Sequence, residues 1–289
     1  MSDIQYLAPT TLDEAVSAYS GAKGSAHILA GGTDLLVQMR SGMVNPGLIV
    51  DIKKIEEITS VKETEDGVFV VGASVSGMEL ANNSNFGKTW PGVLEALNII
   101  GSTQIQGRAS LGGNLCNGSP AGDSVPALIA AEALLTVQGP NGRREIPVKE
   151  VPVSPGKTSL ADNEIAVSFS FPSRPNGSAD AYLRMIPRTE MDIAVLGCGV
   201  SLTIEENTCT RACVGLGAVA PKVLEVEGAA EALIGSQLDE DTIENAAEAC
   251  RACCNPIDDK RGTIYYRTKV SGVLLKRAVA IAAKRAKGV

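Results

Sequence analysis

The stretch GRASLGGNLCNGSPAGDSVPAL, residues 107–128, holds five glycines and two prolines between apolar segments. Because glycine reaches backbone conformations that a Cβ atom forbids, this composition suits a turn of fixed shape inside a domain better than a flexible linker. Its centre, SLGGN at residues 110–114, is followed nine residues later by Asp123. We expect a glycine-rich turn whose Ser110 and Asn114 side chains can bind phosphate oxygens or hydroxyl groups. The alternative is a buried bend in which Asp123 caps the helix that begins with VPALIAA.

A second glycine pair lies in ILAGGTDLL, residues 28–36. The apolar segment at residues 26–30 predicts a short strand that runs directly into Gly31 and Gly32. Glycines at this point let backbone N–H groups approach a diphosphate that a Cβ atom would block, and Thr33 adds a hydroxyl donor. The pattern is neither GxGxxG nor GxxxxGK[ST], so it supports neither a Rossmann turn nor a Walker loop. An ordinary tight turn before a helix remains the alternative.

Helices and strands alternate through the first half of the chain. Thr11 and Glu14 have the spacing of a capping box at the start of a helix over residues 11–20. The later segments predict strands at residues 47–52 and from residue 67, a helix around residues 91–100, a helix followed by a strand over residues 126–137, and a hairpin-like turn at residues 139–146.

A polar loop rich in Pro, Asn, Gly and Ser follows a strand that ends at Pro172. We place the domain boundary in this loop. Beyond it, apolar and polar residues alternate as in an antiparallel sheet, with a turn at Glu206-Asn207. Residues 228–254 and 266–287 predict two helices. The predicted fold class is α+β.

The composition describes a globular chain. Its 289 residues are 44% hydrophobic and 20% charged, with a formal net charge of -7 and a sequence pI of about 5.0. This acidic balance disfavours electrostatic binding to nucleic acid or to an anionic membrane surface. We find no apolar run of the roughly 18 residues that a membrane span needs and no secretion-signal pattern at the start, so we expect a cytoplasmic protein.

The cysteines and the histidine restrict the chemistry. Seven cysteines, an odd number, suggest reduced thiols rather than a disulfide framework. The spacings Cys209-x3-Cys213 and Cys250-x2-Cys253-Cys254 would suit a metal or iron–sulfur site, but core packing is the more ordinary role, and we predict no metal site. His27 is the only histidine, which excludes most catalytic constellations, so redox chemistry would need a cofactor. We therefore assign no catalytic residue.

One known family resembles this chain in four segments: ILAGGTDLL, QIQGRASLGGNLCNGSPAGDSVPAL, RTEMDIAVLG and IDDKRGTIYYRTKVSGVLLKRA. These segments closely resemble the FAD-binding medium subunit of the molybdenum hydroxylase family, which includes carbon monoxide dehydrogenase, xanthine dehydrogenase and nicotinate dehydrogenase. The resemblance covers essentially the whole chain. It implies an FAD-binding domain of the vanillyl-alcohol-oxidase type at residues 1–175, with two α+β subdomains at about 1–58 and 59–175. A C-terminal domain at residues 176–289 would hold a three-stranded antiparallel sheet and helices.

The resemblance also implies which residues hold FAD between the N-terminal subdomains. The family's contacts fall on Leu29, Ala30, Gly31, Gly32, Thr33, Asp34, Leu35 and Leu36, on Gly101, on Ser110, Leu111, Gly112, Gly113 and Asn114, and on Asp123, Ala166 and Arg184. The two glycine segments would hold the diphosphate and the ribityl chain. Ala166 and Arg184 match positions near the isoalloxazine ring, where the charge of Arg184 would stabilise a reduced anionic flavin. Relatives often have Lys at the position of Arg184.

An electron-transfer role follows from the same resemblance. Electrons would arrive singly from two [2Fe-2S] clusters of a small partner subunit, reduce FAD and leave to NAD, oxygen or quinone. Substrate would be hydroxylated at a molybdopterin cofactor in a large partner subunit, within a dimer of heterotrimers. One rival is a self-contained flavin oxidoreductase, which would need a substrate-binding cap and a cluster of Tyr, His or Arg residues. Another is a non-catalytic assembly protein, against which the two intact glycine segments argue.

Overall fold

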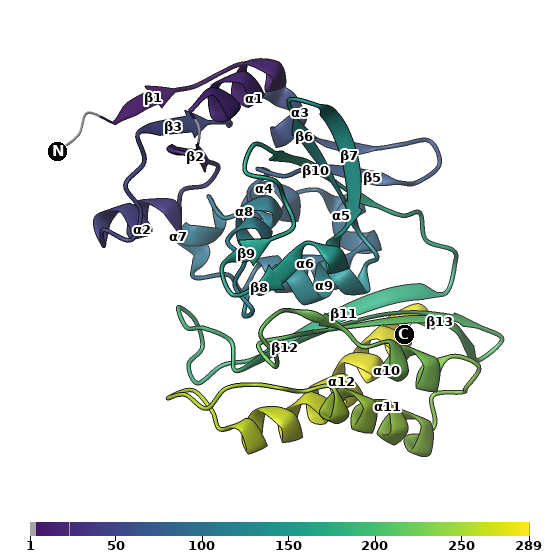
Figure 1. The fold of residues 1–289 in the computed structure, drawn as a ribbon. Coiled ribbons are helices and arrows are strands. Elements are labelled where there is room, and N and C mark those ends of the chain that lie inside the picture. The colour runs from purple at the N-terminus through teal and green to yellow at the C-terminus, as the bar shows by residue number, and fades with distance from the viewer. Residues whose placement is uncertain (1–3, 23, 289) are drawn as a thin grey trace.

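Three larger sheets with their helices follow one another along the chain (Figure 1). The computed structural model describes residues 4–22 and 24–288. One hydrophobic cluster joins the first two sheets and their helices, and a second cluster lies between the third sheet and the C-terminal helices. This arrangement confirms the predicted α+β class.

The first unit is a small parallel sheet in the order β1-β3-β2. Its elements are β1 (Gln5–Leu7), α1 (Leu12–Gly21), β2 (Ala26–Leu29), α2 (Leu35–Arg40), β3 (Leu48–Asp51) and α3 (Glu56–Thr59). The predicted cap of α1 is present, because the Glu14 amide donates to the Thr11 hydroxyl at 3.3 Å. The Glu14 carboxylate accepts from the Thr10 amide, one residue before the position that a capping box predicts.

The second unit is an antiparallel sheet in the order β4-β5-β10-β6-β7, packed against several short helices. Its elements are β4 (Val61–Glu63), β5 (Phe69–Gly72), α4 (Gly77–Ala81), α5 (Ser84–Thr89), α6 (Pro91–Leu97), α7 (Thr103–Gln106), α8 (Leu111–Cys116), α9 (Ser124–Ala130), β6 (Leu134–Gly139), β7 (Gly142–Pro147), the 3-10 turn η1 (Val148–Glu150), β8 (Pro152–Ser154), β9 (Lys157–Thr158) and β10 (Ile165–Phe171). Helix α9 and strand β6 confirm the predicted helix followed by a strand, and β6 and β7 form the predicted hairpin.

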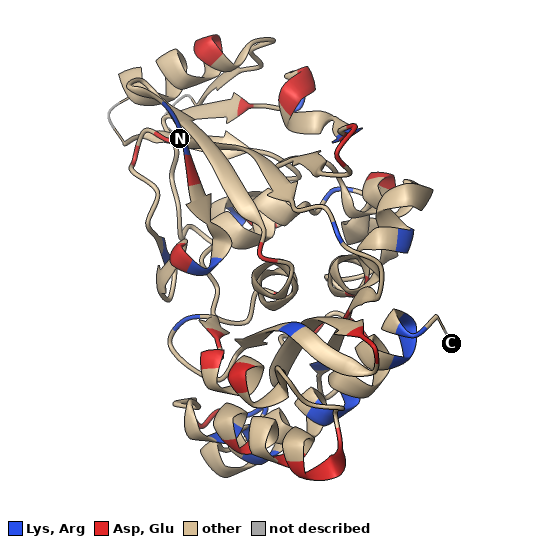
Figure 2. Ribbon diagram, turned by 90° about the vertical axis from the view of Figure 1, so that its right-hand side faces the viewer, with Lys and Arg blue, Asp and Glu red and all other residues tan. Residues whose placement is uncertain are grey.

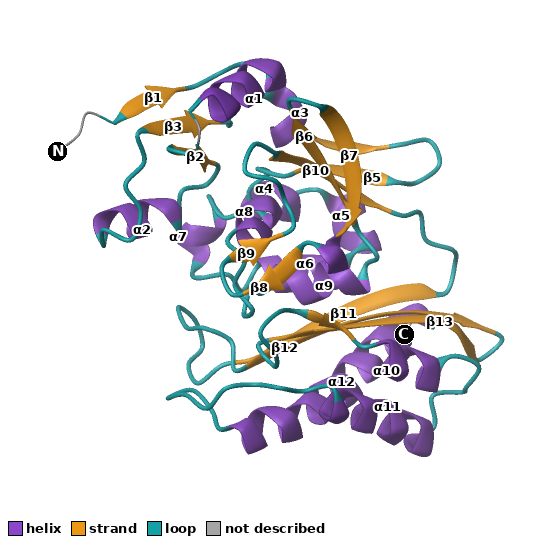
Figure 3. Cartoon of the chain, in the orientation of Figure 1, coloured by secondary structure: helices purple, strands orange, loops and turns teal. Residues whose placement is uncertain are grey.

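The third unit is an antiparallel sheet of three long strands and a two-residue fourth strand, in the order β11-β12-β13-β14. Its elements are β11 (Ser178–Met185), β12 (Leu196–Glu205), β13 (Thr208–Gly217), β14 (Leu224–Glu225), α10 (Glu227–Leu233), α11 (Glu240–Ala252) and α12 (Ile264–Ala286). The predicted turn at Glu206-Asn207 is confirmed, with φ values of 48° and 68°. Helices α10, α11 and α12 lie on one side of the sheet, while α6 and α9 pack on the other (Figure 3).

The prediction of one helix over residues 228–254 is wrong. The chain leaves α10 at Ile234, and Gly235 has a φ of +83°, which a helix cannot accommodate. A new helix then begins at Asp239, whose side chain accepts from the Thr242 amide at 3.0 Å. The polar stretch GSQLDEDT, residues 235–242, therefore marks the break between two helices.

The second and third units meet through buried polar contacts. The Asp180 carboxylate, on β11, accepts from the Val93 amide at the start of α6 and from Arg174 at 3.0 Å. Arg174 in turn lies 4.0 Å from the ring centre of Trp90, a side chain with only 2% of its surface exposed. Arg285 pairs with Glu95 of α6 from the C-terminal end of α12, where Lys and Arg residues gather (Figure 2). These contacts fix the C-terminal sheet and α12 against α6 of the second unit.

Helix α12, predicted over residues 266–287, packs one apolar face on its own sheet, with Leu275, Ala278 and Ala282 fully buried. Within the described residues, none of the helices combines the length and the apolar character that a membrane crossing needs.

Candidate functional site

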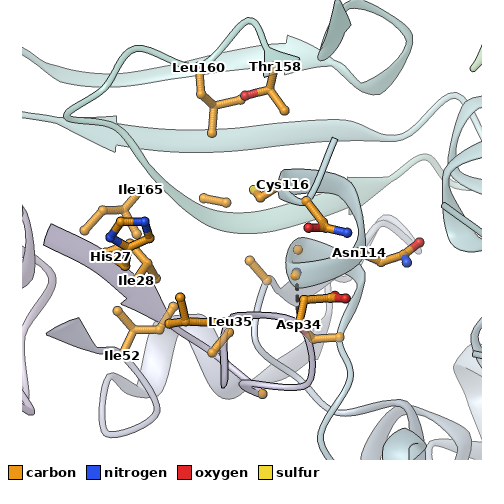
Figure 4. Close-up of a pocket in the computed structure, with 18 of the residues that line it drawn as sticks. His27, Ile28, Asp34, Leu35, Ile52, Asn114, Cys116, Thr158, Leu160 and Ile165 are labelled. Atoms are coloured by element: carbon orange, nitrogen blue, oxygen red, sulfur yellow. Dashed lines mark hydrogen bonds between the residues drawn. The ribbon is translucent and has the colours of Figure 1, made fainter. Parts of the chain in front are cut away.

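A cavity of about 560 Å³ lies where the first and second units meet. Figure 4 shows His27, Ile28 and Ile52 of the first unit on one side and Asn114 and Cys116 of α8 on the other, with the segment around Thr158 and Leu160 across from Asp34 and Leu35. This volume lies within the range of cavities that hold small molecules and cofactors.

The first glycine segment lies on the wall of this cavity. In the described part of the chain, the backbone amides from Gly31 to Leu35 have no hydrogen-bond acceptor. Five successive free N–H groups lead into the N-terminal end of α2, where the peptide dipoles also favour negative charge. A bound anion is the ordinary partner of such a group of amides.

Both glycines of the first segment are required by its geometry. A Cβ atom on Gly31 would lie 1.9 Å from the carbonyl oxygen of Arg108, so the two glycine-rich segments touch backbone to backbone. Gly32 has a φ of +79°, a conformation that side chains other than glycine rarely adopt. The Arg108 side chain also donates to the Gly31 carbonyl at 3.3 Å, across 77 residues of sequence.

The second glycine segment is the start of a helix, which corrects the prediction of a turn at residues 110–114. The hydroxyl of Ser110 caps α8 by accepting from the Gly113 amide at 3.2 Å, and the Gly112 amide donates to the Ala73 carbonyl at 3.0 Å. A Cβ atom on Gly112 would lie 2.5 Å from that carbonyl. The glycines therefore allow α8 to pack closely, and their amides are already paired. The Asn114 carbonyl oxygen accepts from the amide and the hydroxyl of Ser124.

The described residues that line the cavity include no lysine and no arginine. Glu164 lines it but is paired with Arg144 outside it. Burial raises the pKa of Asp34, which also lines the cavity. A negatively charged ligand would therefore depend on the backbone amides for its binding.

Most of the residues predicted to bind a ligand lie together on this cavity. The lining includes Ala30, Gly31, Gly32, Thr33, Asp34, Leu35, Ser110, Gly112, Gly113, Asn114 and Ala166. The lining does not include Leu29, Leu36, Gly101, Leu111, Asp123 and Arg184. Of these, Gly101 lies in the loop before α7, where its carbonyl accepts from the Met191 amide at 3.1 Å.

Asp123 and Arg184 form an ion pair that joins α9 to β11, with a distance of 2.9 Å between Oδ2 and Nη1. The alternative in which Asp123 caps α9 is wrong, because its side chain makes no capping hydrogen bond. Burial raises the pKa of Asp123 to about 6, although Arg184 acts in the opposite direction. The second oxygen, Oδ1, and the nearby Tyr182 hydroxyl are both buried without a hydrogen-bond partner among the described residues.

Sequence reasoning missed one wall of the cavity. Residues Thr158, Leu160, Ala161 and Asp162 carry no recognisable motif, and they reach the site only because β9 and β10 fold over it. His27, which is not among the predicted site residues, lines the cavity, and its Nδ1 is buried with no partner among the described residues. Cys116 also lines it, and desolvation raises the pKa of its thiol to about 11.

Two cysteines suspected of metal binding occupy core positions. Cys213 on β13 and Cys250 on α11 are both buried, as their apolar surroundings predict. Across residues 4–22 and 24–288, we find no group of three His, Cys, Asp or Glu side chains placed to hold a metal ion.

The fold and the cavity together define a two-part α+β protein with a ligand-sized cavity beside its glycine-rich segments, where free backbone amides suit an anionic group. Each of the two parts matches the model of a known protein family. Residues 2–174 match the FAD binding domain in molybdopterin dehydrogenase, and residues 181–282 match the CO dehydrogenase flavoprotein C-terminal domain. The chain belongs to the family of FAD-binding flavoprotein subunits of the molybdenum hydroxylases.

Individual relatives span the whole chain. The carbon monoxide dehydrogenase medium chain of Hydrogenophaga pseudoflava is 32% identical over 275 residues, covering 95% of each chain. The xanthine dehydrogenase FAD-binding subunit of Escherichia coli O157:H7 is 28% identical and covers 98% of this chain and 97% of the relative. Among solved structures, carbon monoxide dehydrogenase from Hydrogenophaga pseudoflava matches with a TM-score of 0.93 at 32% identity, covering 98% of both chains.

Proposed function

We propose that this chain is the FAD-binding electron-transfer subunit of a molybdopterin-dependent hydroxylase or dehydrogenase. The observation that carries the proposal is the row of five free amides from Gly31 to Leu35 on the wall of a cavity of cofactor size. Family membership supports the same cofactor.

The described residues fit FAD because their backbone amides supply the hydrogen bonds that a diphosphate needs, without a lysine or an arginine in the cavity lining. The amides of the first segment would hold the diphosphate by hydrogen bonds and by the dipole of α2. Thr33 adds a hydroxyl at the same wall. On the opposite side, the glycines of α8 keep the wall free of side chains, so a ligand can lie against the helix backbone.

The remaining predicted contacts complete the proposed site. Ala166 lines the cavity from β10, while Leu29, Leu36 and Leu111 shape its surroundings from neighbouring positions. Asp123 and Arg184 hold α9 against β11. We assign them to the ring and ribityl end of the site, together with Gly101.

The partners belong to the proposal as well. When bound, FAD supplies redox chemistry that can take up electrons one at a time and release them in pairs. The electrons would come from two [2Fe-2S] clusters of a small subunit and leave to NAD, oxygen or quinone. A large subunit with molybdopterin would oxidise the substrate, and the assembly would be a dimer of heterotrimers in the cytoplasm. Medium chains and FAD-binding subunits among the relatives support such an assembly.

The cofactor site is tested by Gly113→Val. A Cβ atom at Gly113 would meet only the Ser110 hydroxyl, at 3.3 Å, so the helix can form while the side chain enters the cavity. We expect FAD to bind at least about tenfold more weakly, a loss of about 1.4 kcal/mol. Flavin absorbance and fluorescence titration of the reconstituted chain measure this. Gly32→Val is a poorer test, because the positive φ of Gly32 would strain the backbone itself.

The matched control for Gly113→Val is Gly21→Val, at a surface position where a Cβ atom meets nothing within 4 Å. Gly21→Val should retain FAD like the wild type. If Gly113→Val, folded by circular dichroism, also binds FAD as tightly as the wild type, the proposed site is wrong.

A further inference from the structure

One buried polar side-chain atom on the cavity wall has no partner in the described chain. Buried side-chain nitrogen or oxygen atoms without a hydrogen bond occur at six of the described residues: Ser20, His27, Ser74, Trp90, Asp123 and Tyr182. Of these six residues, His27 is the one that lines the cavity, and its unpaired atom is Nδ1. Because an unpaired buried polar atom costs free energy, such an atom on a cavity wall points to a ligand group that completes its hydrogen bonding.

His27 lies upstream of the amides that suit a diphosphate. It belongs to β2, the strand that leads into the free amides from Gly31 to Leu35. An extended chain rises by about 3.3 Å per residue, so His27 lies up to about 13 Å from Gly31 along the strand. A ligand whose diphosphate lies on these amides therefore presents a different part of itself to His27.

The surroundings of the His27 ring are apolar. Figure 4 shows the imidazole beside Ile28 and Ile165, with Ile52 beyond Ile28, and all of these residues line the cavity. Apolar walls with few, well-placed polar atoms are typical of sites for small organic ligands. A purine suits this place, because its faces are apolar and its edges carry donor and acceptor atoms. Nδ1 donates or accepts according to the tautomer of the imidazole, so it can pair with either kind of atom.

The flavin end of the proposed site lies toward the third unit. Asp123 and Arg184 join α9 to β11. The Gly101 carbonyl accepts from the Met191 amide, in the segment between β11 and β12. His27 lies on the first sheet, and the helices of the second unit separate that sheet from β11 (Figure 1). Because FAD carries its isoalloxazine and adenine rings on opposite sides of the diphosphate, the His27 end is left for the adenosine half.

We propose that His27 recognises the adenosine half of FAD, through a hydrogen bond between Nδ1 and the edge of the adenine ring, and so makes this chain selective for FAD over flavin mononucleotide (FMN). The inference rests on the proposed function, because it assigns one more residue of the same cavity to FAD. His27 acts here in binding and selection of the cofactor, and it takes no part in electron transfer.

Three substitutions of His27 test which ring atom makes the contact. His27→Leu removes both ring nitrogens. His27→Asn keeps a polar atom near the place of Nδ1, and His27→Gln keeps one near the place of Nε2. Since Nδ1 has no partner among the described residues, His27→Leu breaks no hydrogen bond of the FAD-free chain. Its thermal unfolding midpoint without FAD should therefore equal or exceed that of the wild type. The pair His27→Asn and His27→Gln carries the test if His27→Leu does not fold.

Three ligands separate the two halves of FAD. FAD itself, FMN without the adenosine half, and ADP without the flavin are titrated into the FAD-free full-length chain, with ADP followed by its displacement of FAD. His27→Leu and His27→Gln should raise the dissociation constants of FAD and ADP about tenfold, the effect of one lost hydrogen bond. Both variants should leave that of FMN unchanged. His27→Asn should bind all three ligands like the wild type.

Ser20→Ala is the matched control, because the Ser20 hydroxyl is also buried without a partner among the described residues but does not line the cavity. This variant should bind all three ligands like the wild type. The inference is overturned if His27→Leu binds FAD and ADP as tightly as the wild type, if it weakens FMN as much as FAD, or if His27→Gln retains FAD while His27→Asn loses it. Those results leave the proposed function standing, whereas a wild-type chain that binds no FAD overturns the proposed function and this inference with it.

Discussion

At the residue scale, the pKa of the buried Asp123 carboxyl group is set by its burial and by its one charged partner. Asp123 pairs with Arg184 through Oδ2, yet its Oδ1 has no partner among the described residues, and burial has the larger effect on its pKa. The sequence placed an acidic residue after a glycine-rich segment, but it could not show that the partner comes from β11, 61 residues later.

The raised pKa of Asp123 predicts a pH dependence of stability. The folded chain binds this proton up to about pH 6, whereas the ordinary pKa is 3.8. Between those values the folded state holds more protons than the unfolded state, so the free energy of unfolding falls as pH rises from about 4 to about 6 and is then level. The fall is at most about 3 kcal/mol. Urea unfolding of the FAD-free chain at several pH values measures it.

Asp123→Asn is the control for this pH dependence, because the amide keeps the shape of the side chain and does not titrate. The difference in unfolding free energy between the wild type and Asp123→Asn should vary across this pH window. Parallel curves for the two proteins would show that Asp123 is not the group responsible.

At the scale of elements, glycines let helix α9 lie directly on the C-terminal sheet. A Cβ atom on Gly199 of β12 would lie 2.6 Å from the Pro126 carbonyl oxygen, and one on Gly215 of β13 would lie 2.3 Å from it. The two strands pair at these positions, so the glycines form a flat contact beneath the helix. Because neither glycine has a side chain, the backbone of α9 lies in direct contact with strands β12 and β13.

We expect Gly199→Ala to destabilise the chain by about 1–3 kcal/mol, because the added methyl group must push the α9 backbone away from the sheet. Gly228→Ala is the matched substitution, since position 228 lies in α10 and its Cβ atom would meet Ala249 at an ordinary 3.6 Å. That variant should gain up to about 1 kcal/mol of helix stability. Denaturant titrations compare the two, and an equal effect of both would argue against the close contact.

Local patterns predicted elements well where a local rule applies. Thr11 with Glu14, and the alternation around Glu206-Asn207, depend on neighbours within four residues, and both predictions are confirmed. The break after α10 was missed although Gly235 and Asp239 are the residue types that commonly end one helix and cap the next. The start of α8 at Ser110 was taken for a turn because glycines are poor helix formers, while in the fold they serve close packing against Ala73.

At the scale of the molecule, the site is an assembly of distant segments. Gly31 and Arg108 touch across 77 residues, and the wall formed by Thr158, Leu160, Ala161 and Asp162 comes from the end of β9 and its connection to β10. The two glycine segments could be found from the sequence because their composition is unusual. The wall at residues 158–162 could not be found from the sequence, since only the folding of β9 and β10 brings it to the cavity.

The proposed subunit role predicts that this chain by itself turns over no organic substrate. The described lining residues of the cavity include one histidine, with no adjacent nucleophile identified, and a protonated Cys116. We expect that the FAD-reconstituted chain does not reduce an electron-accepting dye when purines, N-heterocycles, aldehydes or carbon monoxide are offered as substrates. The complex purified from the native source through this chain should oxidise one of them. Rapid turnover by the chain alone would contradict the subunit assignment.

Trp90 is the single tryptophan of the chain, and it lies buried at the junction of the second and third units with Arg174 over its ring. The tryptophan fluorescence of the chain therefore reports only on the environment of this junction. Separation of the two halves would expose the indole to water and remove the neighbouring guanidinium, so emission would shift to longer wavelength even if each half kept its own secondary structure. The chain thus carries a native optical probe for the opening of its domain junction, with no label attached.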